Sequence, residues 1–377
     1  MFNVIILGIV SFLTDISTEM VYPLIPLYLV SKLGASPAIV GIIEGVAEST
    51  ASLLRVFSGY ISDLVGKRKP LAILGYGSST IGKVFLYLSR SWGMVFAGRW
   101  IDRFGKGIRT APRDALIADS TEQTKRGRAF GLHRTMDTLG AAIGVILAYY
   151  FFTRFSGDYS RVFLYSLVPA FLGIGVLFFA REGKQAKVSS NSRPKLKWSG
   201  LDKRLKGFLI VTFLFTLGNS SNQFLLLRAK NLGFNDATVL LLYLAYNLVY
   251  MVFAYPAGRL SDRIGRKRLI VIGYVFYGIV YLGFAIVTKA SYLWTLFGLY
   301  GIYIGLTEGV QKALISDIAP VETRATLIGL HATLEGVGLL PASSIAGLLW
   351  NLLGASAPFY FGGIMGIVAA LGMMIVL

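Results

Sequence analysis

The sequence predicts an all-α polytopic membrane protein that consists of two similar halves. Of the 377 residues, 55% are hydrophobic and only 15% are charged, whereas soluble domains average about 25% charged residues. Long apolar runs alternate with short basic loops, and a helix that crosses a bilayer needs roughly 20 such residues. Helices are expected rather than barrel strands, because a helix satisfies its own backbone hydrogen bonds in lipid. A loop sequence that occurs twice indicates the two halves.

The repeated loop has the pattern G-x-x-x-D-x-x-G followed by three basic residues. Its first copy contains Gly59, Asp63, Gly66, Lys67 and Arg68, and its second copy contains Gly258, Asp262, Gly265 and Arg266. The two aspartates are 199 positions apart, and three further matches recur at 198 positions, namely Asp119 with Asp317, Gly131 with Gly329 and His133 with His331. Parallel repeats of this length are one way in which transporters are built.

The apolar runs predict about twelve spans by the length criterion. The spans are expected to begin near Val4, Ala38, Pro70, Trp92, Gly127, Ser160, Lys206, Asp236, Arg268, Ser291, Thr323 and Pro358. They divide into two six-helix bundles, residues 1–180 and 206–377, which a linker at residues 181–205 connects. The first run carries Asp15 and Glu19 and lacks a small-residue cleavage site, so we expect a span rather than a removed signal.

The net charge of +18 is explained by topology rather than by nucleic-acid binding, because the basic residues collect in alternate loops. One side carries the two basic triplets, Lys125 to Arg128, the linker and Arg324, whereas the other side carries only Lys32, Arg90, Arg154, Arg161, Lys230 and Lys289. The positive-inside rule then places both termini and the linker in the cytoplasm, with the protein in the cell membrane. The basic, serine-containing linker is expected to be solvated, or alternatively to bind anionic lipid.

The two basic loops resemble the signature of the major facilitator superfamily between helices 2 and 3 and between helices 8 and 9. The stretch from Arg103 to Arg109 is similar to a helix 4 motif whose arginine is associated with proton coupling in drug exporters, although Arg109 replaces the second glycine of that motif. Asp15 matches an acidic position in helix 1 of exporters. The helix 5 antiporter motif is partly kept from Gly140 to Gly144, with Ala141 where proline is usual. The resemblance implies the major facilitator fold and secondary active transport of the drug/proton antiporter type.

Many ionisable residues fall inside the predicted spans, where each charge costs at least about 2.5 kcal/mol and tends to face a cavity or a partner. The candidate proton-coupling or substrate residues are Asp15, Glu19, Glu44, Glu48, Arg55, Arg99, Arg103, Lys106, Arg109, Asp137, Glu308, Lys312 and Glu335. Spacings of three, four or seven residues place several of them on shared helix faces. Either the carboxylates hold a transported proton beside the basic residues, or acids and bases neutralise each other and only hold the helices together.

The repeated loops are predicted to form a cytoplasmic gate that consists of Gly59, Asp63, Gly66, Lys67, Arg68, Asp119, Asp262, Arg266 and Asp317. State-dependent ion pairs there would favour the outward-open form. The alternative is that the aspartates cap helix ends and the basic residues set the orientation.

Glycines recur at four-residue spacing in two predicted helices, as Gly41 and Gly45 and as Gly301, Gly305 and Gly309. Small residues at this spacing allow helices to pack closely. Hinge motion is the alternative role.

The leading hypothesis is a secondary transporter that works by alternating access and exports a cationic or amphipathic organic solute in exchange for protons. A carrier for organic or phosphorylated anions is an alternative because arginine binds such groups bidentately. A divalent-metal exporter using residues such as His133, Asp137 and His331, and a lipid-handling protein of the same fold, also stay open. No enzyme motif is found. We expect no cofactor or bound metal, a proton as coupling ion, lipids and a small solute as partners, and a monomer.

Overall fold

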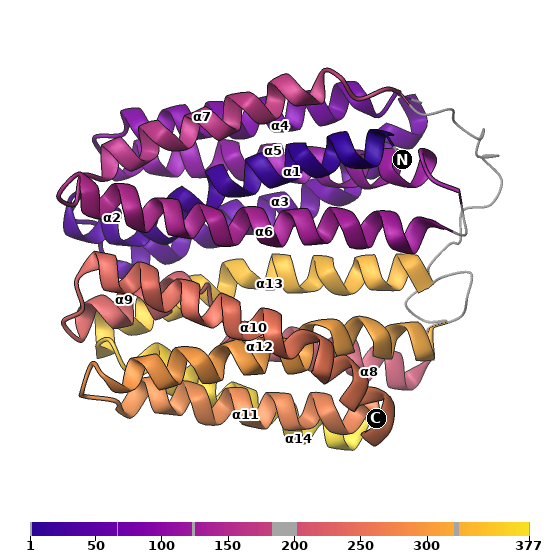
Figure 1. Cartoon of the computed structure of the whole chain (residues 1–377). Helices are drawn as coiled ribbons and strands as arrows, with labels where there is room; N and C mark the ends of the chain where they lie inside the picture. The colour runs from indigo at the N-terminus through magenta and orange to yellow at the C-terminus, as the bar shows by residue number, and fades with distance from the viewer. Residues whose placement is uncertain (1, 66, 123–124, 183–201, 320–323, 377) are drawn as a thin grey trace. The chain divides into compact units, whose positions relative to one another are not determined.

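The computed structural model describes residues 2–65, 67–122, 125–182, 202–319 and 324–376, without the side chains of residues 63, 65, 126–127 and 324–326. Within these ranges the ordered elements are helices, and no strand occurs (Figure 1). The predicted linker lies almost wholly outside the described residues. The all-α class that the sequence predicts is confirmed.

The helices of the first half begin close to the predicted positions. They are α1 (Phe2–Val21), the 3-10 helix η1 (Tyr22–Leu24), α2 (Ile25–Ser31), α3 (Pro37–Val65), α4 (Lys69–Leu88), α5 (Trp92–Asp119), α6 (Arg126–Arg154) and α7 (Tyr159–Leu177). Those of the second half are α8 (Lys203–Gly218), α9 (Gln223–Asn231), α10 (Asp236–Ile264), α11 (Arg266–Ile286), α12 (Tyr292–Ile318), α13 (Arg324–Leu353) and α14 (Ala357–Val376). The predicted start at Thr323 lies outside the described residues.

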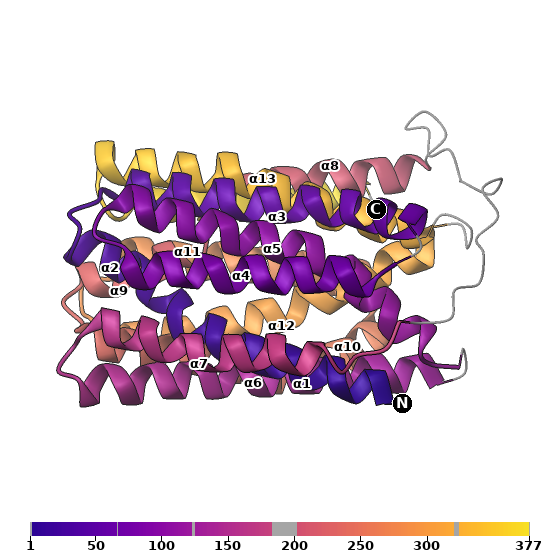
Figure 2. The ribbon, with the colours of Figure 1, turned by 90° about the horizontal axis from the view of Figure 1, so that it is seen from above.

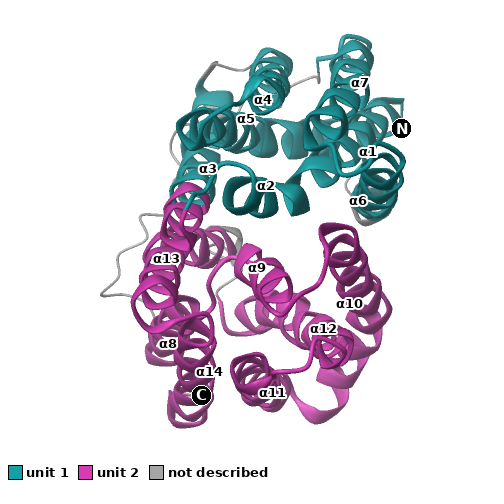
Figure 3. Ribbon diagram, turned by 90° about the vertical axis from the view of Figure 1, so that its left-hand side faces the viewer, with its two compact units in different colours: residues 1–35, 46–189 teal, residues 36–45, 190–377 magenta. Residues whose placement is uncertain are grey.

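The chain separates into two compact units, which Figure 3 shows in different colours. Unit 1 comprises residues 1–35 and 46–189, and unit 2 comprises residues 36–45 and 190–377. The first part of α3 therefore groups with unit 2. The boundaries that the sequence suggested, 1–180 and 206–377, stay a prediction.

Ten helical segments in the described part of the chain are long and apolar enough to cross a membrane. The segments Phe2–Ser31 and Lys203–Asn231 are two of them, and each includes a break in the helix. Helices α5 and α12 also have the necessary length but are not among these ten, and α5 carries many charged residues. The protein is an integral membrane protein that includes the strongly charged helix α5.

The two breaks occupy equivalent positions in the repeat. In unit 1 the chain passes from α1 through η1 to α2, where Pro23 and Pro26 each lack the backbone N–H that a continuous helix requires. In unit 2 residues 219–222 separate α8 from α9. Tyr22 and Ser220 are 198 positions apart, the spacing of the other repeat matches. Broken helices at matching positions are typical of the binding regions of transporters.

Glycine allows α4 and α5 to pack with their backbones in contact. A Cβ atom at Gly75 would lie 2.6 Å from the carbonyl oxygen of Gly105, and one at Gly82 would lie 2.5 Å from that of Gly98. The relation is reciprocal, since Cβ atoms at Gly105 and Gly98 would meet the carbonyls of Gly75 and Gly82. This close packing fixes the position of α5, the helix that carries most of the buried charges.

Helix α1 lies beside α6 and α7 in unit 1 (Figure 2). Gly144 provides the close approach to α6, because a Cβ atom there would lie 2.6 Å from the carbonyl oxygen of Ile16. In unit 2, Gly301 meets the backbone of Tyr246 on α10, whereas a Cβ atom at Gly309 would meet nothing within 4 Å. The packing role predicted for these glycines therefore fits Gly301 and not Gly309.

Candidate functional site

Four charged side chains form an ion-pair cluster between α3 and α5 in unit 1. Arg99 lies 3.2 Å from both Glu48 Oε1 and Asp102 Oδ2. Arg103 lies 3.1 Å from the same oxygen of Glu48 and 3.2 Å from that of Asp102. Each guanidinium thus contacts both carboxylates. We refer to Glu48, Arg99, Asp102 and Arg103 as the α3–α5 cluster.

Burial explains why these four charges need one another. The side chains of Arg99 and Arg103 are 1% and 4% exposed, and that of Glu48 is 23% exposed. An unpaired buried charge costs several kcal/mol, which pairing with good geometry offsets. Two positive and two negative charges cancel within the cluster. This geometry is the one expected of charge neutralisation. The Glu48 carboxylate is engaged in ion pairs with Arg99 and Arg103.

Lys83 adds a further buried cation beside the cluster. It lies in the C-terminal third of α4, is 2% exposed, and donates a hydrogen bond of 3.0 Å to Thr18 Oγ1 on α1. A cavity of about 10 Å³ lies next to it, lined by Thr18, Val21, Tyr22, Ile25, Lys83, Leu86, Arg99 and Asp102. That volume is on the order of one water molecule. The break at η1 therefore lies at a small cavity with both charged and apolar lining residues. The Tyr22 ring there is 5.0 Å from the Arg99 guanidinium carbon.

Asp15 on α1 differs from Glu48 because no described residue forms an ion pair with it. Its side chain is half-buried, and among the described residues it forms no hydrogen bond or ion pair. Glu19, one turn later on α1, is also half-buried and has a contacting partner. A carboxylate without a partner within a membrane-spanning segment can gain or lose a proton without first breaking an ion pair.

A second polar group lies closer to the N-terminal end of α1. The Ser11 hydroxyl is 2.9 Å from His133 Nε2, and the His133 ring is 3.7 Å from the Asp137 carboxylate through Nδ1. Arg113 donates to Ser11 at 3.2 Å. Helices α1 and α5 thus each contribute one member of this group and α6 contributes two, and Asp137 keeps one buried oxygen without a hydrogen bond.

Arg109 faces the α4 side of the same region. It donates a hydrogen bond to Ser79 and lies 4.5 Å from the centre of the Tyr76 ring. Such a cation over an aromatic ring contributes about 0.5–2 kcal/mol. Of the other basic candidates on this side, Lys106 is half-buried and Arg55 is exposed.

The histidine and carboxylate pair recurs in unit 2. His331 Nδ1 lies 3.5 Å from Glu335 on α13, and the residues of the two pairs are 198 positions apart. The His331 ring stacks on Phe208 at 5.6 Å, and neither ring nitrogen has a hydrogen-bond partner. In both pairs the acid follows the histidine by four residues, the spacing that places two side chains on one helix face.

Polar side chains at the break between α8 and α9 form hydrogen bonds within unit 2. Tyr300 donates to Asn222 Oδ1 at 2.7 Å, and Asn222 donates to the Tyr246 hydroxyl at 3.2 Å. The next residue, Gln223, donates to Glu44 Oε2 at 2.9 Å. Glu44 is therefore placed with unit 2 and apart from Glu48, although the two residues are one turn apart on α3.

The remaining candidates of unit 2 lie on α12. Glu308 accepts a hydrogen bond of 2.8 Å from the Tyr250 hydroxyl and pairs with Lys312 at 3.3 Å. Both members of the pair are about half exposed, with side-chain exposures of 42% for Glu308 and 51% for Lys312. An exposed pair of this kind contributes little to stability.

The predicted gate contains an equivalent ion pair in each unit. Arg68 lies 3.1 Å from Asp119 at the end of α5, and Arg266 pairs with Asp317 near the end of α12. Arg266 also lies 3.5 Å from Asp262, one turn earlier. Gly59 packs towards Ala111, and Lys67 is exposed. Gly66 and the side chain of Asp63 lie outside the described residues, so the counterpart of the Asp262 contact is not described.

Sequence reasoning omitted two members of this site from its candidates. Asp102 is not among those candidates, yet it completes the α3–α5 cluster. Lys83 was not singled out, although a lone lysine in the apolar run from Leu71 to Leu88 is itself a signal. Among the described residues no group of three or more potential ligands is arranged to hold a metal ion.

The comparisons with known proteins agree with this architecture. The family model of the Major Facilitator Superfamily matches residues 7–227 and 208–377. An uncharacterized MFS-type transporter of Methanocaldococcus jannaschii is 40% identical, with 98% of this chain and 93% of the relative covered. A homolog of the multi-drug resistance efflux pump PmrA in Lactococcus lactis is 27% identical, with 92% and 89% covered.

Solved structures show the same fold at low sequence identity. The nucleoside transporter NupG matches with a TM-score of 0.83 and 14% identity, and all of both chains is covered. A D-xylose-proton symporter matches with a TM-score of 0.80 and 18% identity, with 99% of this chain and 97% of that chain covered. The repeated loop, the helical architecture and these matches lead to one conclusion: the chain belongs to the Major Facilitator Superfamily.

Proposed function

We propose that the protein exports a small cationic or amphipathic organic solute in exchange for protons. The observation that carries this proposal is the state of Asp15, which is half-buried on a membrane-spanning helix without an ion pair among the described residues. A carboxylate in this position can bind a proton or a cationic solute, and the two would compete for it. Such competition is sufficient to couple export of the solute to entry of the proton.

The other carboxylates of unit 1 support this assignment by contrast. Glu48 and Asp102 each contact two arginines, so protonation of either would leave buried positive charge uncompensated. Asp15 forms no ion pair with an arginine among the described residues. The similarity to a multi-drug resistance efflux pump homolog favours export of an organic solute.

A carrier for organic or phosphorylated anions is the second candidate, and Lys83 is the observation that favours it. This buried cation has only the Thr18 hydroxyl as a hydrogen-bond partner in the described chain, and it lies at the small cavity beside the break in the first span. A lysine in such a place can bind an anion directly.

Proteoliposomes that contain a pH-sensitive dye distinguish the two candidates. The purified protein is challenged with cationic, neutral and anionic solutes, and the change in internal pH is followed. We expect cationic or amphipathic solutes to move protons, and Asp15→Asn to abolish that movement. Glu122→Gln is a matched control, because Glu122 is an exposed carboxylate in a connecting segment. Proton movement driven by anions and lost in Lys83→Gln would establish the second candidate instead.

A further inference from the structure

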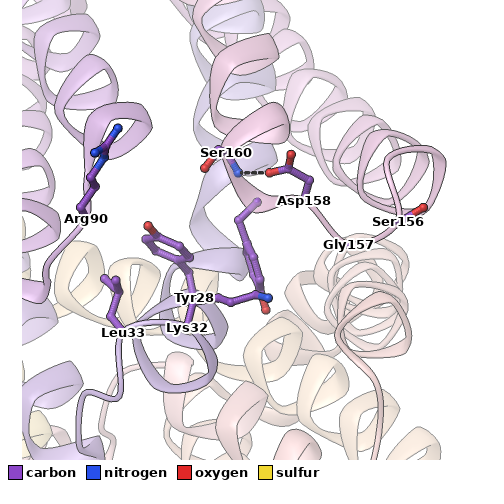
Figure 4. Close-up of a pocket in the computed structure, with 9 residues that line it drawn as sticks. Tyr28, Lys32, Leu33, Arg90, Ser156, Gly157, Asp158 and Ser160 are labelled. Carbon is purple, nitrogen blue, oxygen red and sulfur yellow. Dashed lines mark hydrogen bonds between the residues drawn. The ribbon is translucent and has the colours of Figure 1, made fainter.

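A cavity of about 520 Å³ lies at one end of unit 1, where three connections meet (Figure 4). Its lining comes from the end of α2, the α4–α5 turn and the α6–α7 turn, with Tyr28, Lys32, Leu33, Arg90, Ser156, Gly157, Asp158, Tyr159 and Ser160. Figure 4 shows Arg90 on one side, and Asp158, Ser160 and Ser156 on the other. The volume is within the usual range for small-molecule sites.

The charges around this cavity do not cancel. Asp158 is its only acidic lining residue, and that carboxylate already caps α7 by accepting from the backbone N–H groups of Ser160 and Arg161. It also pairs with the Arg161 side chain at 3.3 Å. Lys32 and Arg90 are exposed, and neither has an ion-pair partner in the part of the chain that the structure describes. Two positive charges are therefore left for a ligand.

Contacts of Tyr28 hold the lining segments of the cavity in place. Tyr28 is 9% exposed and donates a hydrogen bond of 2.7 Å to the backbone carbonyl of Ser89, the residue before Arg90. Its ring also packs against Tyr159 at 5.3 Å and Phe163 at 5.5 Å. Tyr28 thereby joins all three chain segments that carry the lining residues. Preorganisation of this kind reduces the entropy cost of binding.

The position of these cations is unusual for the predicted topology. The side of the protein that the charge distribution assigns to the outside has few basic residues, and Lys32 and Arg90 are two of the six that the sequence places there. Both belong to the rim of the same cavity. Basic residues at the level of the lipid headgroups attract anionic groups.

We propose that this cavity binds an anionic phosphate group through Lys32 and Arg90. Two sources can supply the group: the headgroup of an anionic lipid in the outer leaflet, or a free phosphorylated molecule outside the cell. The chemistry is the same in both cases, since arginine binds a phosphate through two parallel hydrogen bonds and lysine binds it as a point charge. The site is separate from the α3–α5 cluster and does not depend on the direction of transport.

The test measures the melting temperature of the full chain purified in an uncharged detergent. Inorganic phosphate is added in one arm, with chloride at matched ionic strength as the reference. Short-chain phosphatidylglycerol is added in the other arm, with short-chain phosphatidylcholine as the reference. Each arm is repeated with Lys32→Gln, Arg90→Gln and the double variant. Lys289→Gln is the matched control, because Lys289 is an exposed basic residue of the same predicted side that does not line the cavity.

We expect the ligand to raise the melting temperature of the unmodified protein and of Lys289→Gln. Each single substitution should weaken the apparent affinity about fivefold, and the double variant should lose the shift. A response to phosphate assigns a free phosphorylated ligand, and a response to phosphatidylglycerol alone assigns the lipid headgroup. The proposal is overturned by the absence of any shift in the unmodified protein, or by a shift that is undiminished in the double variant.

Discussion

Arg103 on α5 lies 3.1 Å from Glu48 on α3, and through this contact the two helices share a buried charge pair. Arg99, one turn earlier, reaches the same carboxylate oxygen. The arrangement separates the acidic residues of unit 1 into two classes. Glu48 and Asp102 are held by arginines, whereas Asp15 has no such partner among the described residues.

Substitution of Glu48 by glutamine should destabilise the protein. The change leaves two buried guanidiniums with Asp102 as their only carboxylate in the cluster, and removing one partner of a buried pair costs about 3–5 kcal/mol. Because Glu48 is partly exposed, we expect about 3 kcal/mol, seen as a lower melting temperature in detergent. Glu122→Gln is the control, since Glu122 is exposed and its ion pair within the described part of the chain is with Lys125, three residues away. Equal melting temperatures for the two variants would refute this account of the cluster.

Substitution of Gly105 by alanine should also destabilise the protein. The new Cβ atom would meet the backbone carbonyl of Gly75, and a helix backbone cannot yield as a flexible side chain can. Overpacking of this kind costs about 1–3 kcal/mol. Gly309→Ala is the matched control, because its Cβ atom has open space. The expected order of melting temperatures is Gly309→Ala above Gly105→Ala, and the reverse order would contradict the packing of α4 on α5.

Substitution of Asp317 by asparagine should change the population of the outward-open form more than it changes the free energy of unfolding. The Asp317 side chain is 52% exposed, so its pair with Arg266 contributes at most about 1 kcal/mol. If that pair favours the outward-open form, as the predicted gate requires, the population of this form should fall about fivefold.

The chain contains no cysteine, so a single Ser220→Cys can report accessibility without background. We expect an impermeant maleimide applied on the predicted outer side to label it more slowly in Asp317→Asn than in the protein with Asp317 intact. Glu122→Gln should leave the rate unchanged. A labelling rate that is equal in all three proteins would contradict the predicted gate.

Substitution of Asn222 by alanine should remove one hydrogen bond from each of two tyrosine hydroxyls at the break between α8 and α9. Tyr300 loses an acceptor and Tyr246 loses a donor, and each lost hydrogen bond costs about 0.5–1.5 kcal/mol. The expected result is a lower melting temperature together with weaker solute binding. Asn247→Ala provides a comparison, since Asn247 donates only to the Tyr243 carbonyl on its own helix. Solute binding that is reduced equally in both variants would argue against a local role for Asn222.

Sequence patterns predicted the helices and the contacts within single helices. The starts of the spans follow from the lengths of apolar runs, and the contacts of His133 with Asp137 and of His331 with Glu335 follow from four-residue spacing. Each of these features depends on residues close in sequence, for which the helical period is sufficient information.

The same sequence patterns did not predict the contacts between helices. Glu44 and Glu48 share a face of α3, yet Gln223 contacts the first and two arginines of α5 contact the second. The neighbour of each depends on tertiary packing, which periodicity does not encode. The interruption at residues 219–222 was also missed, because the prediction used the lengths of apolar runs, which a few polar residues do not end.

The role of Asp15 in coupling proton movement to solute export can be measured with two fluxes of one solute in proteoliposomes. One is uphill transport driven by an imposed pH gradient, and the other is exchange of labelled for unlabelled solute without a gradient. For Asp15→Asn we expect loss of the uphill flux, with exchange retained only at higher solute concentration, because the variant has no carboxylate for which proton and solute can compete. Uphill transport by Asp15→Asn at the rate of the unmodified protein would rule out this role of Asp15.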